Sequence, residues 1–113
     1  MARNKQTMNY YISYATNNWK NSQKFAENKA YENGADKVIS YGPENLENDF
    51  VKKNIKILSN SKGGGLWLWK PYLILKTLQS INEGDKLIYC DSGMYPIQNL
   101  KYMFDLVENR DIA

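Results

Sequence analysis

Residues 62–93 have the sequence KGGGLWLWKPYLILKTLQSINEGDKLIYCDSG, which decides the fold. A glycine loop and an aromatic segment lead into a helix that Pro71 can open and Gly84 can end. Residues 86–90 then form a short, mostly apolar strand, and Asp91 follows it directly. Ligands of open α/β sheets bind beyond the carboxyl ends of the strands, so Asp91 is the first candidate site residue.

The composition sets limits on the class of protein. A chain of 113 residues supports one domain with a modest core. The net charge of +3 comes from lysines spread along the chain, which disfavours a nucleic-acid binder. Cys90 is the single cysteine and there is no histidine, which excludes an internal disulfide, a His/Cys zinc site and a nucleophile activated by histidine. The apolar runs are shorter than the roughly 18 residues of a membrane span, so we expect a cytoplasmic protein without one.

The chain supplies three strands and four helices. Aromatic and β-branched runs predict the strands, and apolar residues at helical spacing predict the helices. Residues 1–8 are expected to be a flexible terminus, residues 9–113 a single domain, and Gly34 the end of the first helix. The predicted strands are residues 9–15, 36–41 and 86–90, and the predicted helices are residues 18–33, 44–58, 71–82 and 98–109.

The later helices each have an apolar stripe that is expected to face the core. Pro71 disfavours helical angles at Lys70, so the third helix is predicted to begin near Pro71. The stripes are Leu46, Phe50, Ile55 and Leu58 in the second helix, Ile74, Leu75, Leu78 and Ile81 in the third, and Leu100, Met103, Phe104 and Val107 in the fourth.

The order of strands and helices predicts a small Rossmann-like α/β domain with three layers, α/β/α, and a short, mainly parallel sheet with right-handed crossovers. If the first and third strands are neighbours, the strand order is 2-1-3 and their carboxyl ends flank the crevice where ligands bind. Both edges of so narrow a sheet would be open unless another chain or segment paired with them. We therefore expect either self-association or a larger architecture of which this is the front portion.

Each candidate site residue has a functional and a structural interpretation. Asp91 can hold a divalent cation that bridges a diphosphate, or its side chain can cap the turn that it begins. Thr16 and Asn17 end the first strand and face Asp91 in the 2-1-3 order, but Asn17 or Asn18 can equally cap the following helix. Cys90 lies within a strand and is expected to be a small buried apolar residue.

The segment before the third helix offers further candidates. Lys70 can join the helix N-terminus in holding an anion, or it can be a solvated lysine. Trp67, Trp69 and Tyr72 can stack on a base or sugar, or they can belong to the core. The glycines at 63–65 can approach phosphates closely, or they can form an ordinary flexible loop.

Together these residues resemble a family, the GT-A (nucleotide-diphospho-sugar transferase) type glycosyltransferase-like proteins of bacteria and viruses. The resemblance lies in VISYG at 38–42, Phe50 with Asn54, KGGGLWLWKPY at 62–72 and GDKLIYCDSG at 84–93, and it covers most of residues 9–105. It corresponds to the N-terminal half of that fold only.

The resemblance implies a nucleotide-sugar-dependent glycosyltransferase, or a truncated relative, that binds a nucleoside diphosphate sugar at the carboxyl edge of the sheet. It implies that Mn²⁺ or Mg²⁺ is held at Asp91, and that an unidentified glycan or other molecule is the acceptor. The family signature has a second aspartate where this chain has Gly93. The implied nucleotide-sugar-binding residues are Thr16, Asn17, Trp67, Trp69, Lys70, Asp91, Ser92 and Gly93.

Two other functions fit the same pattern. The chain can be a non-catalytic binding module that self-associates as a homo-oligomer through the open sheet edge. It can also be a flavodoxin-like or response-regulator-like domain, although a response regulator needs an acidic pair after its first strand and residues 14–17 contain none.

Overall fold

A computed structural model of the chain describes residues 7–58 and 68–108. Within them, strands and helices alternate in the order expected of parallel strands joined by helical crossovers. The elements, including two short 3₁₀ helices, are β1 (Asn9–Tyr14), η1 (Asn17–Trp19), α1 (Lys20–Glu32), β2 (Lys37–Tyr41), η2 (Pro43–Asn45), α2 (Asn48–Lys53), α3 (Ile55–Leu58), α5 (Trp69–Ser80), β3 (Lys86–Tyr89) and α6 (Lys101–Asp105).

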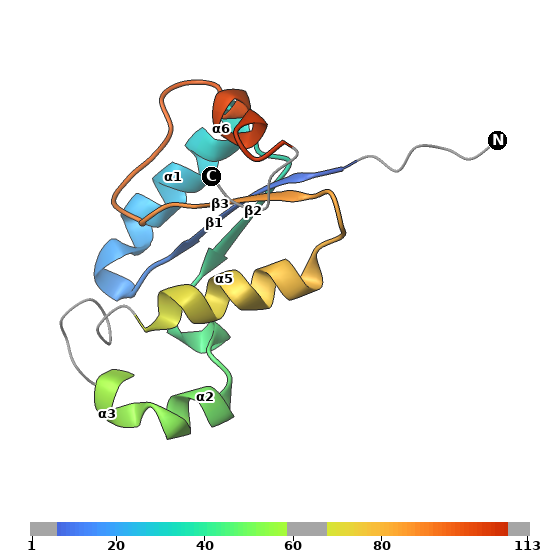
Figure 1. Cartoon of the computed structure of the whole chain (residues 1–113). Helices are drawn as coiled ribbons and strands as arrows, with labels where there is room; N and C mark the ends of the chain where they lie inside the picture. Colours follow the sequence, from blue (N-terminus) through green and yellow to red (C-terminus); the bar gives the residue numbers. More distant parts are fainter. Residues whose placement is uncertain (1–6, 59–67, 109–113) are drawn as a thin grey trace.

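The three strands form one parallel sheet in the order β2-β1-β3, which confirms the predicted 2-1-3 order (Figure 1). The central strand pairs with both neighbours, so that Tyr11 lies beside Val38 on one side and beside Ile88 on the other. The predicted strand positions agree with the observed ones to within a residue at either end. The chain is therefore a small α/β domain.

Alternate residues of β1 face two separate cores, one on each face of the sheet. Tyr11 packs with Ala30 of α1 and Phe104 of α6, whereas Ile12 packs with Leu73 of α5. Figure 1 shows the same arrangement, with α1 and α6 on one side of the sheet and α5 on the other. The three predicted layers are present in the described residues.

Helix α5 differs from its prediction in both its start and its buried face. It begins at Trp69, so Lys70 is helical, and Pro71 lies in the first turn, where a backbone N–H has no partner within the helix. Leu75 and Leu78 are 57% and 51% exposed, and the prediction that they face the core is wrong. The buried residues are Trp69, Leu73 and Thr77, which form another stripe of helical spacing.

The predicted helix at 44–58 is broken into η2, α2 and α3. Asparagine side chains explain both breaks, because they compete for backbone groups. The Asn45 side chain accepts the Gly42 N–H at 2.8 Å, and Leu46 then takes extended angles. The Asn54 side chain donates to the Phe50 carbonyl at 2.8 Å where α2 ends. Ile55, predicted to be buried, is 54% exposed.

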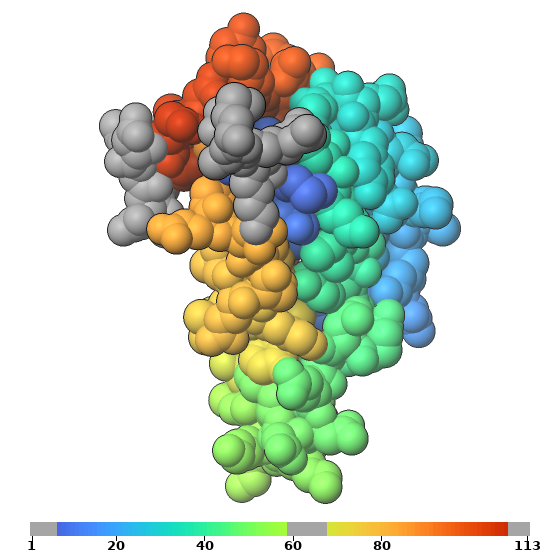
Figure 2. All heavy atoms as spheres, turned by 90° about the vertical axis from the view of Figure 1, so that its right-hand side faces the viewer, coloured from blue at the N-terminus to red at the C-terminus, as the bar shows by residue number. Residues whose placement is uncertain are grey.

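The α2–α3 segment lies at one end of the molecule, below α5 (Figure 2). It contacts α5 through the Phe50 and Tyr72 rings, which stack with centroids 3.9 Å apart. The Tyr72 hydroxyl also donates to Glu47 at 3.0 Å, and the Lys76 ammonium lies 3.9 Å from the same carboxylate. These contacts place the segment beside the first half of α5.

The predicted helix end at Gly34 is confirmed, but α5 already ends at Ser80 and Gly84 lies in the turn before β3. The last helix is also shorter than expected. Gly34 and Gly84 have φ values of 111° and 92°, a backbone region that suits glycine. Helix α6 covers Lys101–Asp105 of the predicted 98–109, the last residue of which lies outside the described residues. Phe104 is buried as predicted, but Met103 is 50% exposed.

None of the helices in residues 7–58 and 68–108 is long and apolar enough to cross a bilayer.

Candidate ligand site at the carboxyl edge of the sheet

β1 and β3 are neighbouring parallel strands, so their carboxyl ends lie side by side where the ligand crevice is predicted. Helix α1 follows β1 on one face of the sheet, and α5 precedes β3 on the opposite face (Figure 1). Two backbone bonds hold the strand ends in place, from Ala15 N–H to the Tyr41 carbonyl at 3.0 Å and from Cys90 N–H to the Ile12 carbonyl at 3.1 Å. This is the topological switch point at which doubly wound sheets bind ligands.

Asp91 lies at this edge with its carboxylate exposed. The turn that it begins is closed by its backbone carbonyl, which accepts the Met94 N–H at 3.0 Å. No backbone N–H of the described residues donates to the carboxylate, which lies near the Tyr89 hydroxyl instead, so the predicted side-chain cap of the turn is wrong. Ser92, the next residue, is only 8% exposed.

Thr16 and Asn17 follow β1 directly, at the same edge of the sheet as the residues that follow β3. Their carbonyls accept the N–H groups of Trp19 and Lys20 and so form η1. Neither η1 nor α1 has a side-chain cap, which contradicts the capping interpretation of Asn17 and Asn18. Within residues 7–58 and 68–108, the Asn17 amide is therefore available to a ligand.

Trp69 and Lys70 belong to the first turn of α5. The Lys70 ammonium lies 4.9 Å from the centroid of the Tyr89 ring, a cation–π contact at the end of β3. Trp69 is buried and stacks on Tyr14 with centroids 4.1 Å apart, so its ring lies in the core. Trp67 and the glycines at 63–65 lie outside the described residues.

Sequence reasoning missed Tyr89, whose hydroxyl oxygen is buried without a hydrogen-bond partner among the described residues. Burial raises the pKa of Tyr89, and the negative charge of nearby Asp91 raises it further. Burial likewise raises the pKa of the Cys90 thiol, and Cys90 packs against the core on the opposite face, in agreement with its apolar interpretation. Tyr11, the second tyrosine with an unpaired buried hydroxyl, lies in that core.

Removing either unpaired hydroxyl should not destabilise the fold. Tyr11→Phe and Tyr89→Phe are each expected to change the free energy of unfolding by between 0 and about +1 kcal/mol, because an unbonded hydroxyl only costs desolvation. Tyr41→Phe is the matched control. It should lose about 1 kcal/mol, because the Tyr41 hydroxyl bonds to Thr77 at 2.8 Å. Urea unfolding measures all three, and a loss in Tyr89→Phe as large as in Tyr41→Phe would show that the Tyr89 hydroxyl is bonded.

The same two tyrosines predict how stability depends on alkaline pH. Their pKa values are raised in the folded chain, so the unfolded chain releases the phenolic protons first. The free energy of unfolding should therefore fall as the pH rises above about 10, the ordinary tyrosine value. The fall should be smaller in the Tyr11→Phe/Tyr89→Phe double variant, and an equal fall in both proteins would contradict the assignment.

A second unpredicted contact fixes the path of the chain after β3. A Cβ atom added at Gly93 would lie 3.1 Å from Cζ3 of the Trp19 ring, which leaves little room for any side chain there. Trp19 follows β1 and Gly93 follows β3, so this contact joins the two segments that border the crevice. No local pattern signals it, because the residues are distant in the sequence.

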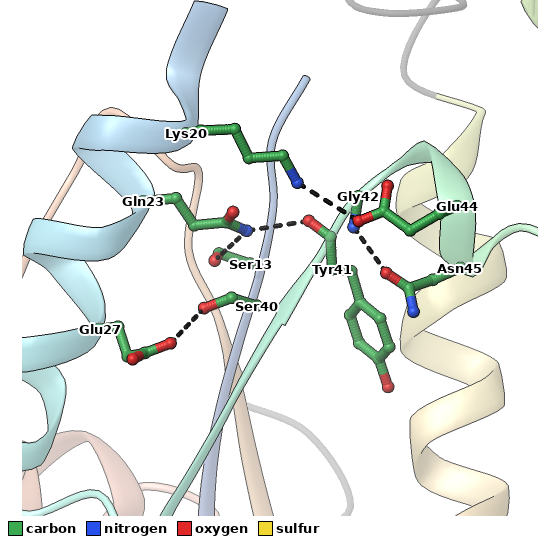
Figure 3. A network of polar contacts seen from close by, with 9 residues as sticks. All are labelled: Ser13, Lys20, Gln23, Glu27, Ser40, Tyr41, Gly42, Glu44 and Asn45. Atoms are coloured by element: carbon green, nitrogen blue, oxygen red, sulfur yellow. Dashed lines mark hydrogen bonds and ion pairs between the residues drawn. The ribbon is translucent and has the colours of Figure 1, made fainter. Parts of the chain in front are cut away.

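A polar network ties α1 to the ends of β1 and β2 (Figure 3). The buried Gln23 amide donates to the Ser13 hydroxyl at 3.1 Å and to the Tyr41 carbonyl at 2.9 Å. Farther along α1, the Ser40 hydroxyl donates to Glu27 at 2.9 Å. The network holds the start of α1, and with it the segment after β1, in place.

The donor set limits how a metal ion can bind. The described residues contain no group of three or more Asp, Glu, Cys or His side chains that could hold one. Asp91 therefore offers one carboxylate, which suits Mg²⁺ or Mn²⁺ only if phosphate oxygens and water complete the coordination.

Searches of family models, of curated proteins and of solved structures find no match to this chain.

Proposed function

We propose that the chain binds a nucleoside diphosphate sugar at the carboxyl edge between β1 and β3, as a glycosyltransferase or a shortened relative of one. The observation that supports the proposal is the strand order, in which Asn17 and Asp91 follow neighbouring strands at one edge of the sheet. Lys70 lies near the same edge, because it lies over the Tyr89 ring at the end of β3. A carboxylate, an amide and an ammonium group thus lie near the edge at which such sheets bind nucleotides.

The charges of the site suit a diphosphate with a bound cation. The Lys70 ammonium attracts phosphate oxygens directly. The Asp91 carboxylate would repel them unless a divalent cation lay between, so Asp91 is the residue that would hold Mn²⁺ or Mg²⁺ against the diphosphate. Such an ion would stabilise the negative charge of the leaving diphosphate during transfer.

The remaining predicted residues have separate roles. Thr16 and Asn17 supply a hydroxyl and an amide that can bond to the ribose or base. Ser92 and Gly93 continue the wall of the crevice beyond Asp91. Trp69 supports the site from the core by its stacking on Tyr14, and direct contact of Trp67 or Trp69 with the nucleotide stays a prediction.

Thermal shift with a panel of UDP, GDP, CMP and their sugars, with and without Mn²⁺, tests the proposal. A ligand present at about 100 times its Kd adds about 2.7 kcal/mol to the free energy of unfolding, which raises Tm by about 10 °C in a domain of this size. Asp91→Asn should abolish the part of the rise that depends on Mn²⁺. Asp49→Asn, which changes an exposed acid of α2, is the matched control and should keep it.

Two results would refute this function. One is a panel in which no nucleotide or nucleotide sugar moves Tm. The other is an Asp91→Asn variant that responds as the unchanged protein does. Transfer of the sugar is then a separate measurement, because it also requires an acceptor held against the anomeric carbon.

A second candidate, a module that self-associates, is favoured by the sheet edges. Among the described residues, β2 and β3 each pair on one side only. Unpaired edges can accept a strand from another copy. Analytical ultracentrifugation that gives a monomer at all concentrations would remove this candidate, whereas a dimer insensitive to the nucleotide panel would favour it over the enzyme.

A further inference from the structure

A pocket of about 290 Å³ lies beside the candidate site, between the first two turns of α1 and the segment that follows β3. It is separate from the Lys70 side of the crevice, because α1 and α5 cover opposite faces of the sheet. Its lining residues come from the segments after two neighbouring strands. They are Asn21, Ser22, Phe25, Ser92, Gly93 and Tyr95.

The polar side chains of the lining are uncharged, and their hydrogen-bonding groups have no partner among the described residues. Asn21 supplies an amide, and Ser22, Ser92 and Tyr95 supply hydroxyls. None of these four side chains makes a hydrogen bond to another residue in the described parts of the chain. Ser92 is only 8% exposed and lines the pocket. Its unpaired hydroxyl therefore lies toward the pocket rather than toward open solvent. Four groups that can both donate and accept are therefore ready for a ligand.

The apolar part of the lining is aromatic. The Phe25 and Tyr95 rings meet edge to face, with centroids 4.8 Å apart and planes at 90°. Phe25 is 48% and Tyr95 49% exposed, so both rings keep surface that a ligand can cover. Aromatic faces carry partial negative charge and attract the weakly positive C–H groups of a ligand.

We propose that this pocket binds a neutral pyranose ring. Such a ring has an apolar face of C–H groups for an aromatic side chain and a rim of hydroxyls for amides and serine side chains. No lining residue is charged, although the Lys29 ammonium lies 5.6 Å from the centroid of the Phe25 ring. No lining carboxylate is present to hold a metal ion. The volume lies at the lower end of ligand pockets, which suits one ring rather than a whole nucleotide.

The proposal goes beyond the nucleotide site and does not depend on it. Ser92 and Gly93 follow Asp91 directly, so a sugar in this pocket would lie next to the candidate diphosphate site. The ring could come from a glycan or from the hexose of a nucleotide sugar. Methyl glycosides carry the ring alone and a UDP-hexose carries it on a nucleotide, so a comparison of their binding separates these two sources.

Saturation-transfer NMR of the nucleotide-free protein with methyl glycosides of glucose, galactose, mannose and N-acetylglucosamine tests the pocket. At least one glycoside should bind, with saturation of its C–H protons. Phe25→Leu should weaken that binding about tenfold, the factor that corresponds to 1.4 kcal/mol. Ser92→Ala should weaken it several-fold, as expected for one lost hydrogen bond. Tyr102→Leu, at an aromatic residue of α6 that is 74% exposed, is the matched control and should bind normally.

Several results would overturn the pocket assignment. They are no binding of any glycoside at tens of millimolar, equal weakening in Tyr102→Leu, or binding of uridine in place of every glycoside. Binding of a UDP-hexose without binding of any methyl glycoside would also overturn it. Conversely, glycoside binding by a protein that ignores the nucleotide panel would support the pocket while refuting the proposed function. Circular dichroism and Tm of each variant confirm that it is folded.

Discussion

Leu73→Ala is expected to lower the free energy of unfolding by about 2–5 kcal/mol, because the side chain is completely buried and its removal leaves a cavity. Leu73 packs with Ile12, Tyr14 and Trp69 between α5 and the sheet. A small domain has a total stability of about 5–15 kcal/mol, so this loss removes a large part of it. Urea unfolding at several temperatures measures the difference.

Leu75→Ala and Leu78→Ala are the matched controls on the same helix. Both side chains are more than half exposed, and each substitution should change the free energy of unfolding by no more than about 0.5 kcal/mol. The three variants differ only in the face of α5 that they alter. If Leu75→Ala cost as much as Leu73→Ala, the buried face would be the stripe predicted from the sequence instead.

The local sequence pattern of α5 cannot decide which face of the helix is buried. Apolar residues occur nearly all round this helix, so more than one stripe has helical spacing. The partners on the sheet select the stripe. The Thr77 hydroxyl donates to the Leu73 carbonyl at 2.8 Å and accepts the Tyr41 hydroxyl, so a polar residue is preferred to a leucine at this buried position. Such a contact joins residues 36 positions apart and leaves no periodic signal.

Other parts of the fold could be predicted because their causes are local. The strands follow from short apolar and aromatic runs, and the end of α1 follows from the backbone freedom of Gly34. The breaks near Asn45 and Asn54 could not be predicted, because each depends on an asparagine side chain that bonds to a backbone group in place of the helix.

The candidate site also has one part that could be predicted from the sequence and one part that could not. Topology alone predicts that Thr16, Asn17 and Asp91 come to one edge, because strand order and crossover side determine where strand ends meet. The pocket of Phe25 and Tyr95 could not be predicted, since it depends on the path of the chain after β3 and on how that segment packs against α1.

Gln23→Glu is expected to lower the free energy of unfolding at neutral pH by about 2–4 kcal/mol. The Gln23 side chain is 3% exposed and donates both of its bonds from one nitrogen. An ionised glutamate is isosteric but has no donor, so its oxygen would face the Tyr41 carbonyl oxygen in a buried site. The substitution therefore adds a buried charge and a repulsive contact while conserving volume.

The loss in Gln23→Glu should depend on pH in a defined direction. Burial beside a carbonyl raises the pKa of the introduced carboxyl group in the folded chain above its unfolded value. The folded variant therefore binds a proton more readily than the unfolded chain, and its deficit relative to the parent protein should shrink as the pH falls. A protonated glutamate can also donate to the Tyr41 carbonyl again. Gln79→Glu, on the exposed side of α5, is the matched control and should stay within about 0.5 kcal/mol of the parent. A Gln23→Glu deficit that is small, or equal at every pH, would mean that α1 does not hold the ends of β1 and β2 through this amide.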